Sequence, residues 1–176
     1  MSNKQENKVA KETGGYTTIA SGALYFQKAD VRLDNFLIEC KTTREPFYKL
    51  KRSTWEKIQK EALKDGMRIP LMQVDLENSK YRVAIIDYND FLSFDLDEYV
   101  YVRTKEEVTK KSTRIKKLEP YNLSPKTKSD ITGTIVPFYI RKDIIFKDRK
   151  KKDLHLVILE WEDFLMLMSN KDDENE

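Results

Sequence analysis

Residues 29–41 read ADVRLDNFLIECK, in which two apolar runs flank an Asp-Asn pair. Asparagine tolerates the positive φ angles that a two-residue hairpin turn requires. The stretch therefore predicts a tight hairpin that turns at Asp34-Asn35. In this register Val31 faces Ile38, and the two apolar runs form neighbouring strands.

The predicted hairpin places two carboxylates opposite each other. Asp30 comes one residue before Val31 and Glu39 one residue after Ile38, so their side chains are expected about 5 Å apart. Two carboxylates at that distance repel each other and destabilise the hairpin, whereas a divalent cation between them turns the repulsion into attraction. The sequence therefore predicts a metal site, and carboxylate oxygens suit magnesium, manganese or calcium.

A lysine accompanies the two acids. Side chains alternate across a strand, so Glu39 and Lys41 share one face while Cys40 points to the other. A metal held by carboxylates lowers the pKa of a bound water and stabilises the charge that builds on a phosphorane. Lys41 can position the attacking water or stabilise that same charge, which points to phosphodiester hydrolysis. An ordinary ion pair at a strand end is the alternative, because Glu-x-Lys also occurs at Glu6-Asn7-Lys8.

Composition restricts the class of protein and of chemistry. Hydrophobic residues make up 39% and charged residues 36% of the chain, which indicates an ordered domain under a charged surface. Cys40 and His155 are the only cysteine and histidine, which excludes a disulfide within the chain and disfavours a cysteine–histidine zinc site. The first fifteen residues are polar, and no apolar run has the length of a membrane span. We expect a cytoplasmic protein, in the host cytoplasm if a phage encodes it, with no membrane partner.

Periodicity and capping signals predict the elements that follow the hairpin. Ser53 and Glu56 form a capping box ahead of an apolar helical face, and Gly66 is placed to end that helix. The other predicted elements are a polar helix over residues 4–13, strands over residues 69–76 and 81–86, and a short helix over residues 90–94. A helix between strands indicates an α/β sheet with a crossover connection.

The second half of the chain partly echoes the first. Residues 83–92 and 156–165 both run from an apolar strand through an acid and an aromatic residue to Asp-Phe-Leu. This suggests a duplicated strand–strand–helix element whose first strand covers residues 135–140. The alternative is that many apolar strands lead into short helices capped by acids. Residues 104–130 are expected to form a basic connector.

Basic residues gather in two stretches, although the net charge is only +3. Residues 105–128 and 141–152 are rich in lysine and arginine, as a phosphate-binding face would be. A solvated surface explains each stretch equally well. The candidate DNA-binding residues are Lys49, Lys51, Arg52, Lys116 and Lys117.

Several motifs occur in a recognisable order along the first half. They are Glu6-Asn7-Lys8-Val9-Ala10 with Gly14-Gly15, Ser21-Gly22-Ala23, Ala29-Asp30-Val31, residues 36–43, and Glu61-Ala62 with Pro70. Together they resemble the PD-(D/E)xK nuclease superfamily, and residues 4–94 are similar to phage and archaeal-type Holliday-junction resolvases. The resemblance implies that Asp30 and Glu39 bind Mg²⁺, for which Mn²⁺ can substitute, and that Lys41 is the catalytic lysine. It also implies that Glu6 is an accessory acid at the metal and that Ser21 lies near the scissile phosphate.

The resemblance implies an α/β fold of the restriction-endonuclease-like type, with a mixed central sheet flanked by helices. Residues 1–94 would form the nuclease core, and residues 95–176 a basic connector plus a strand–strand–helix α+β extension that can continue the same sheet. We expect a Mg-dependent, structure-specific endodeoxyribonuclease, first of all a Holliday-junction resolvase that acts on branched DNA as a homodimer. The alternatives are a nuclease of the same fold acting on other DNA structures and a catalytically silent DNA-binding or scaffolding protein. The extension offers a surface for a replication or packaging partner.

Overall fold

A mixed sheet of eight strands forms the centre of the molecule, in the order β1-β2-β3-β5-β6-β12-β11-β7. The computed structural model describes residues 2–18, 30–94, 100–118, 127–129, 135–137 and 139–172. The strands of this sheet are β1 Tyr16–Thr17, β2 Val31–Arg32, β3 Phe36–Thr43, β5 Ile69–Leu76, β6 Tyr81–Asp87, β12 Leu154–Glu160, β11 Tyr139–Phe146 and β7 Val100–Val108. Strand β3 is parallel to β5 and β7 is parallel to β11, whereas the other neighbours are antiparallel.

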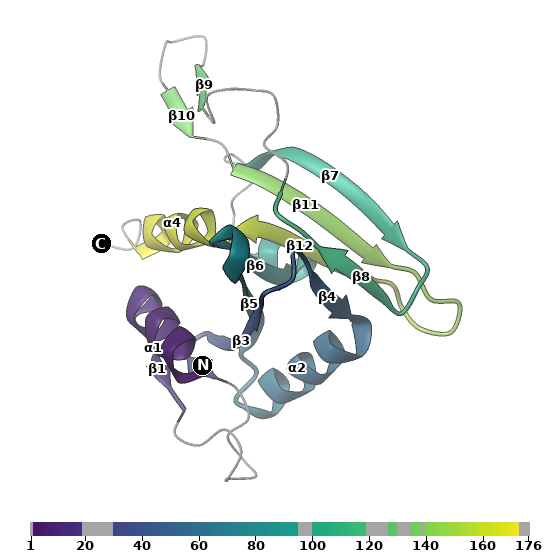
Figure 1. Cartoon of the computed structure of the whole chain (residues 1–176), viewed down its shortest axis with the longest axis horizontal. Helices are drawn as coiled ribbons and strands as arrows, with labels where there is room; N and C mark the ends of the chain where they lie inside the picture. The colour runs from purple at the N-terminus through teal and green to yellow at the C-terminus, as the bar shows by residue number, and fades with distance from the viewer. Residues whose placement is uncertain are drawn as a thin grey trace.

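Helices and two small sheets complete the architecture (Figure 1). The helices are α1 Ser2–Thr13, α2 Arg52–Lys64, α3 Tyr88–Leu92 and α4 Trp161–Asp172, with a 3₁₀ turn at Glu77–Ser79. Strand β4 Tyr48–Lys51 pairs with β8 Ser112–Ile115, and β9 Thr127–Ser129 pairs with β10 Ile135–Pro137. The chain is therefore an α/β protein with a mixed central sheet flanked by helices. None of the helices among the described residues is long and apolar enough to cross a membrane.

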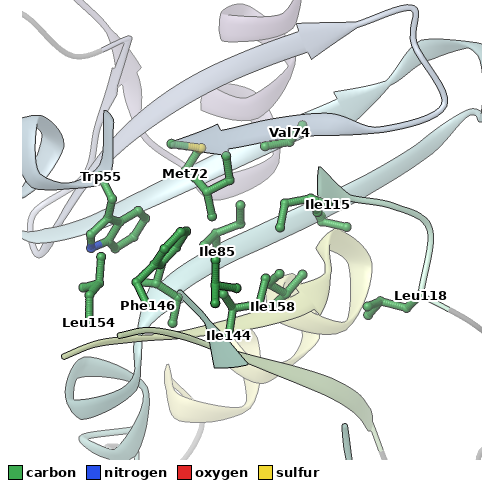
Figure 2. Close-up of a cluster of buried hydrophobic side chains, with 14 of the residues drawn as sticks. Trp55, Met72, Val74, Ile85, Ile115, Leu118, Ile144, Phe146, Leu154 and Ile158 are labelled. Atoms are coloured by element: carbon green, nitrogen blue, oxygen red, sulfur yellow. The ribbon is translucent and has the colours of Figure 1, made fainter. Parts of the chain in front are cut away.

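The two faces of the sheet bury separate apolar clusters because side chains alternate along each strand. On one face, Trp55 of α2 and Ile115 of β8 pack over Met72, Ile85 and Ile158 of the sheet (Figure 2). The other face is covered by α1, α3 and α4, whose buried residues include Val9, Phe91, Trp161 and Phe164. Both faces of the central strands are thus dry, which explains their nearly continuous apolar sequences.

The register of the predicted hairpin near one edge of the sheet is confirmed, but neither Asp34 nor Asn35 has the positive φ that was expected of a two-residue turn. Val31 pairs with Ile38, and the backbone N–H of Leu33 donates to the carbonyl of Phe36 at 3.0 Å. Asp34 and Asn35 are exposed at the turn. A one-residue slip would move every apolar side chain of this hairpin to the wrong face, so the apolar pattern holds the register.

Helix α2 begins at Arg52, one residue before the predicted cap. Strand β4 runs directly into the helix, and Lys51 at the boundary is extended (φ −100°, ψ 137°) with no side-chain capping hydrogen bond. The predicted capping box at Ser53 is therefore wrong. The Arg52 N–H donates instead to the carbonyl of Lys111 at 3.0 Å, because the pairing of β4 with β8 brings that acceptor close. Gly66 follows the helix with a φ of +84°, as expected for a residue that ends a helix.

The other predicted elements differ from the observed ones mainly at their boundaries. The strands predicted over residues 69–76 and 81–86 are confirmed, and the short helix begins at Tyr88 rather than at residue 90. The strand before β12 covers Tyr139–Phe146 and not residues 135–140, which hold β10 and only the start of β11. Strands β7 and β8 occupy much of the segment that was expected to be a connector. Its charged side chains concealed them, because one face of each strand is exposed.

The two halves of the sheet repeat one strand pattern about a local two-fold axis. Ile85 of β6 pairs with Ile158 of β12 at its centre. Outward from them, Met72 of β5 pairs with Ile85 and Lys142 of β11 with Ile158. The next pairs outward join parallel strands: Met72 pairs with Glu39 of β3 on one side, and Lys142 pairs with Thr104 of β7 on the other. The repeated sequences at residues 83–92 and 156–165 occupy equivalent places in this pattern.

The small sheet of β4 and β8, which we name the ribbon, follows the same symmetry. Strand β4 comes after β3 and strand β8 after β7, and the two pair antiparallel with Lys49 directly opposite Arg114. Leu50 and Ile115 are buried on the underside of the ribbon, whereas Lys49 and Arg114 are exposed on its outer face. Equivalent strands from the two halves thus meet over α2's side of the sheet (Figure 1).

Candidate active site

The hairpin places Asp30 beside Glu39 at the edge of the central sheet. The Asp30 N–H donates to the carbonyl of Ile38 at 3.2 Å, which continues the pairing of β2 with β3 by one residue. The backbone N–H of Cys40 donates to Asp30 Oδ2 at 2.7 Å and holds that carboxylate against β3. Both acids are half-buried. The charges of Asp30 and Glu39 therefore interact, although the ladder of β2 and β3 covers only the pairs Val31–Ile38 and Arg32–Leu37.

The electrostatics of Asp30 reflect this crowding. Burial, followed by the charge of Glu39, raises the pKa of Asp30 to about 6, against the opposing hydrogen bond from Cys40. The charge of Glu6 acts in the same direction. A carboxylate that resists ionisation among other acids marks a site that lacks positive charge.

Lys41 supplies part of the missing charge. Its Nζ donates a hydrogen bond to Glu39 Oε1, two residues along the same face of β3. Burial acts to lower the pKa of Lys41, but the hydrogen bond and the charge of Glu39 raise it overall. Lys41 is therefore a charged donor that is held in place beside the two carboxylates.

A hollow of about 450 Å³ opens in front of Glu39 and Lys41, and we name it the first hollow. Tyr48 of β4 lines it, and burial raises the pKa of this phenol, which keeps the hydroxyl protonated. Lys49 and Lys51 lie exposed on its rim. Glu39 and Lys41 are thus open to a large anionic ligand that approaches over β4, whereas Asp30 does not line this hollow. A further hollow of about 650 Å³ lies at the turn of the hairpin and does not include these side chains.

Helix α1 supports the site from the opposite face of the sheet. Glu6 is 6% exposed, and its charge reaches Asp30, so it lies close to the carboxylate pair. Gln5, its neighbour, donates to the carbonyl of Lys41 at 2.9 Å and to Gln73 Oε1 at 2.7 Å. These bonds tie the end of β3 to α1 and to β5. Sequence reasoning missed both glutamines, although a polar Gln73 within an apolar strand was a usable signal.

The donor set fits a divalent cation held by carboxylate oxygens. Asp30 and Glu39 lie close enough for their charges to interact, Lys41 compensates the charge of Glu39, and Glu6 adds a third acid nearby. No three aspartate, glutamate, histidine or cysteine side chains converge tightly enough to enclose an ion by themselves in the described part of the chain. Ser21 lies outside the described residues.

The remaining predicted residues fall into two groups. Lys49 and Lys51 are exposed beside the first hollow, whereas Lys116 and Lys117 are exposed at a different hollow. Arg52 points into the protein: its guanidinium donates to Glu56 Oε1 at 2.9 Å and to the carbonyls of Phe146 and Lys152 at 3.3 Å and 2.6 Å. These acceptors lock the beginning of α2 to the far end of the sheet.

Comparison of the chain with protein-family models and with curated proteins gave no match.

Proposed function

We propose that this protein is a metal-dependent DNA endonuclease with a PD-(D/E)xK core of the restriction-endonuclease-like type. The observation that carries the proposal is the closeness of two carboxylates, Asp30 and Glu39, with Lys41 bound to Glu39 at an open hollow that Glu39 and Lys41 line. Asp30 and Glu39 would hold Mg²⁺ or Mn²⁺, with Glu6 as an accessory acid. When bound, the ion supplies positive charge for the phosphate and makes a water more acidic.

The protein's own groups position the phosphodiester. Lys41 donates from its ammonium to a phosphate oxygen or to the attacking water, and so stabilises the negative charge of the transition state. Glu39 orients that ammonium through its hydrogen bond. The Cys40 N–H fixes the carboxylate of Asp30, and Gln5 fixes the backbone at Lys41. Lys49 and Lys51 attract the flanking phosphates at the rim.

A Holliday junction is the substrate that we propose first, and the protein would act on it as a homodimer. The motifs of residues 4–94 resemble junction resolvases, as described above. In the part of the chain that the structure describes there is a single set of these residues, because Thr104 and Glu106 stand at the places of Glu39 and Lys41 in the second half. Two symmetric cuts therefore require two chains. We place this activity in the cytoplasm, and residues 95–176 leave room for a replication or packaging partner.

Cleavage of a labelled four-way junction tests the function. Asp30→Asn, Glu39→Gln and Lys41→Ala should each abolish cleavage in magnesium while binding in EDTA stays close to that of the unaltered protein. Glu45→Gln is the matched control, since it removes an exposed acid from the turn after β3. Full cleavage by all three site variants would rule the proposal out.

The choice of substrate is tested separately. Cleavage of a junction, a flap, a single strand and a linear duplex should be compared under the same conditions. Preference for a flap or a duplex would support the proposed nuclease activity and rule out the Holliday junction as its main substrate. Binding of a junction without any cleavage in Mg²⁺ or Mn²⁺ would instead support a silent scaffolding protein.

A further inference from the structure

A second hollow, of about 950 Å³, lies in the second half of the sheet at the place equivalent to the first. The axis that relates Ile85 to Ile158 also relates Lys49 to Arg114, which pair across the ribbon. Lys116 follows Arg114 at the same spacing as Lys51 follows Lys49. The rim of the first hollow, formed by Lys49 and Lys51, thus corresponds to Arg114 and Lys116 at the second.

The chemistry of the first hollow is not repeated in the second. Glu106 stands where the first half has Lys41, and its carboxylate accepts from Thr113 Oγ1 at 2.7 Å and from Lys142 Nζ at 2.5 Å. Thr104 stands where the first half has Glu39. Among the described residues, the second hollow therefore has no pair of facing carboxylates, and the charge of Glu106 is already balanced by Lys142.

Positive charge is in excess at the second hollow. Six lysine and arginine side chains line it against two acids, Glu106 and Glu107. Glu106 pairs with Lys142, and Glu107 lies 4.0 Å from Lys147, whose ammonium also binds Asp153 at 2.7 Å. The other five lining cations, namely Lys49, Lys110, Arg114, Lys116 and Lys117, make no ion pair with an acid of the described ranges.

The arrangement of these cations is unfavourable without an anion. Lys49 and Arg114 are directly opposite each other on the exposed face of the ribbon, where like charges destabilise a strand pair. The Arg114 guanidinium stacks over the ring of Phe47 at 4.4 Å, which fixes its plane. A planar arginine held in this way presents two N–H groups to a phosphate.

The ribbon is also anchored firmly enough to act as a platform. Ile115 and Leu118, neighbours of these cations in the chain, are buried in the apolar cluster on this face of the sheet (Figure 2). The ammonium of Lys117 lies over the ring of Tyr81, 5.6 Å from the ring centroid. The Tyr81 hydroxyl accepts a hydrogen bond from the Leu118 N–H at 3.2 Å. Cations on a fixed strand pair lose little side-chain freedom when they bind a ligand.

We propose that the second hollow binds the phosphate backbone of DNA without cutting it, and that it holds a second segment of the substrate while the first hollow cuts. Lys49 lines both hollows, so one positively charged surface runs from the carboxylates across the ribbon to Arg114 and Lys117. Duplex DNA carries its charge along a continuous backbone and suits such a path. The cutting role of the first hollow rests on the proposed function, whereas binding at the second does not.

The test is the binding of a fluorescently labelled four-way junction in EDTA at several salt concentrations. Arg114→Gln with Lys116→Gln should weaken binding tenfold or more at low salt. The slope of log affinity against log salt should become shallower by about two, since each phosphate contact on duplex DNA contributes about 0.9. Arg114→Lys keeps the charge but loses the planar guanidinium. Its affinity for the junction should therefore lie between that of the unaltered protein and that of the double variant.

Lys60→Gln with Lys64→Gln is the matched control. It removes two exposed cations from α2 that line neither hollow, and it should leave the salt slope unchanged. Thermal melting shows whether each variant is folded. A folded double variant of Arg114 and Lys116 that binds as the control does would overturn the inference.

The outcomes separate this inference from the proposed function. Cleavage by the unaltered protein, together with normal binding by the double variant, would overturn the proposed second binding site and support the proposed nuclease activity. Loss of binding in the double variant, together with no cleavage by any form of the protein, would keep the second site and remove the nuclease.

Discussion

The two halves of the sheet have the same strand order and directions but differ in whether their partly buried acids are neutralised. In the first half, Asp30 and Glu39 crowd together, and the pKa of Asp30 is raised to about 6, by burial first and the charge of Glu39 second. In the second half, hydrogen bonds from Lys142 and Thr113 lower the pKa of Glu106 despite its burial. One half keeps an electrostatic conflict and the other resolves it. Conflicts of this kind cost stability, and they mark the place where a ligand is expected.

The middle strands of the two halves show a similar contrast. Gln73 of β5 and Asp143 of β11 occupy equivalent positions, and both are fully buried. Gln73 is bound by Gln5 of α1, which links it to the carboxylate site. Asp143 is bound by Arg141 at 2.5 Å and 2.9 Å and by His155 at 2.8 Å, on a strand that holds no predicted site residue. Polar groups in the second half therefore stabilise the fold, whereas those in the first half also position a site.

The largest expected effect is on cleavage, when Glu39 of the first half is replaced by threonine, the residue at the equivalent position 104 of the second half. Glu39→Thr should reduce junction cleavage in magnesium by about 10³-fold or more, because it removes a proposed metal ligand and the partner of Lys41. The reciprocal change Thr104→Glu should leave cleavage within about twofold of normal, since Thr104 is exposed and has no facing acid in the described structure. Equal losses in the two variants would show that the halves do not differ in this way.

The next effect concerns stability and is confined to the second half. Asp143→Ala leaves the buried guanidinium of Arg141 without its carboxylate and should lower the free energy of unfolding by about 3–5 kcal/mol. Gln73→Leu, at the equivalent place, should cost about 1–2 kcal/mol, because the Gln5 amide that loses its partner is neutral and Asp75, which loses a second hydrogen bond, keeps Arg82. Urea unfolding of both variants measures this difference. A smaller loss for Asp143→Ala than for Gln73→Leu would contradict the contrast between the strands.

The smallest effect has the opposite sign and depends on pH. Asp30 is protonated more readily in the folded state, with a pKa of about 6, than in the unfolded state at 3.8. Its contribution to stability is therefore most favourable below about pH 4, and it is lost as the pH rises to about 6. Asp30→Asn keeps an acceptor for the Cys40 N–H and removes the charge, so in EDTA at pH 7 it should raise the free energy of unfolding by about 1–2 kcal/mol, after allowance for solvent at this half-buried position.

Thermal melts between pH 4 and pH 8 measure this effect. Magnesium should raise the melting temperature of the unaltered protein, since a ligand that binds only the folded state stabilises it. It should have little effect on Asp30→Asn. A variant that is less stable than the unaltered protein at pH 7 in EDTA would show that Asp30 is not in conflict with Glu39.

The register of the hairpin that carries Asp30 and Glu39 followed from the sequence alone. The Asp34-Asn35 turn and the alternation of apolar residues determine which side chains face each other, so the pairing of Val31 with Ile38 was predictable. The same alternation places Glu39 and Lys41 on one face. Strand periodicity also predicted β5 and β6 correctly. All of these features depend on residues that are close together in the chain.

Tertiary structure alone decided the features that join distant segments. The repeat of residues 83–92 and 156–165 hinted at two equivalent halves, but neither the pairing of β4 with β8 nor that of β6 with β12 could be read from local pattern, because each joins strands more than 60 residues apart. The same pairing moved the start of α2 to Arg52 and turned that arginine into the protein. Local propensities act over a few residues, whereas the burial of two apolar sheet faces selects among all the arrangements that those propensities allow.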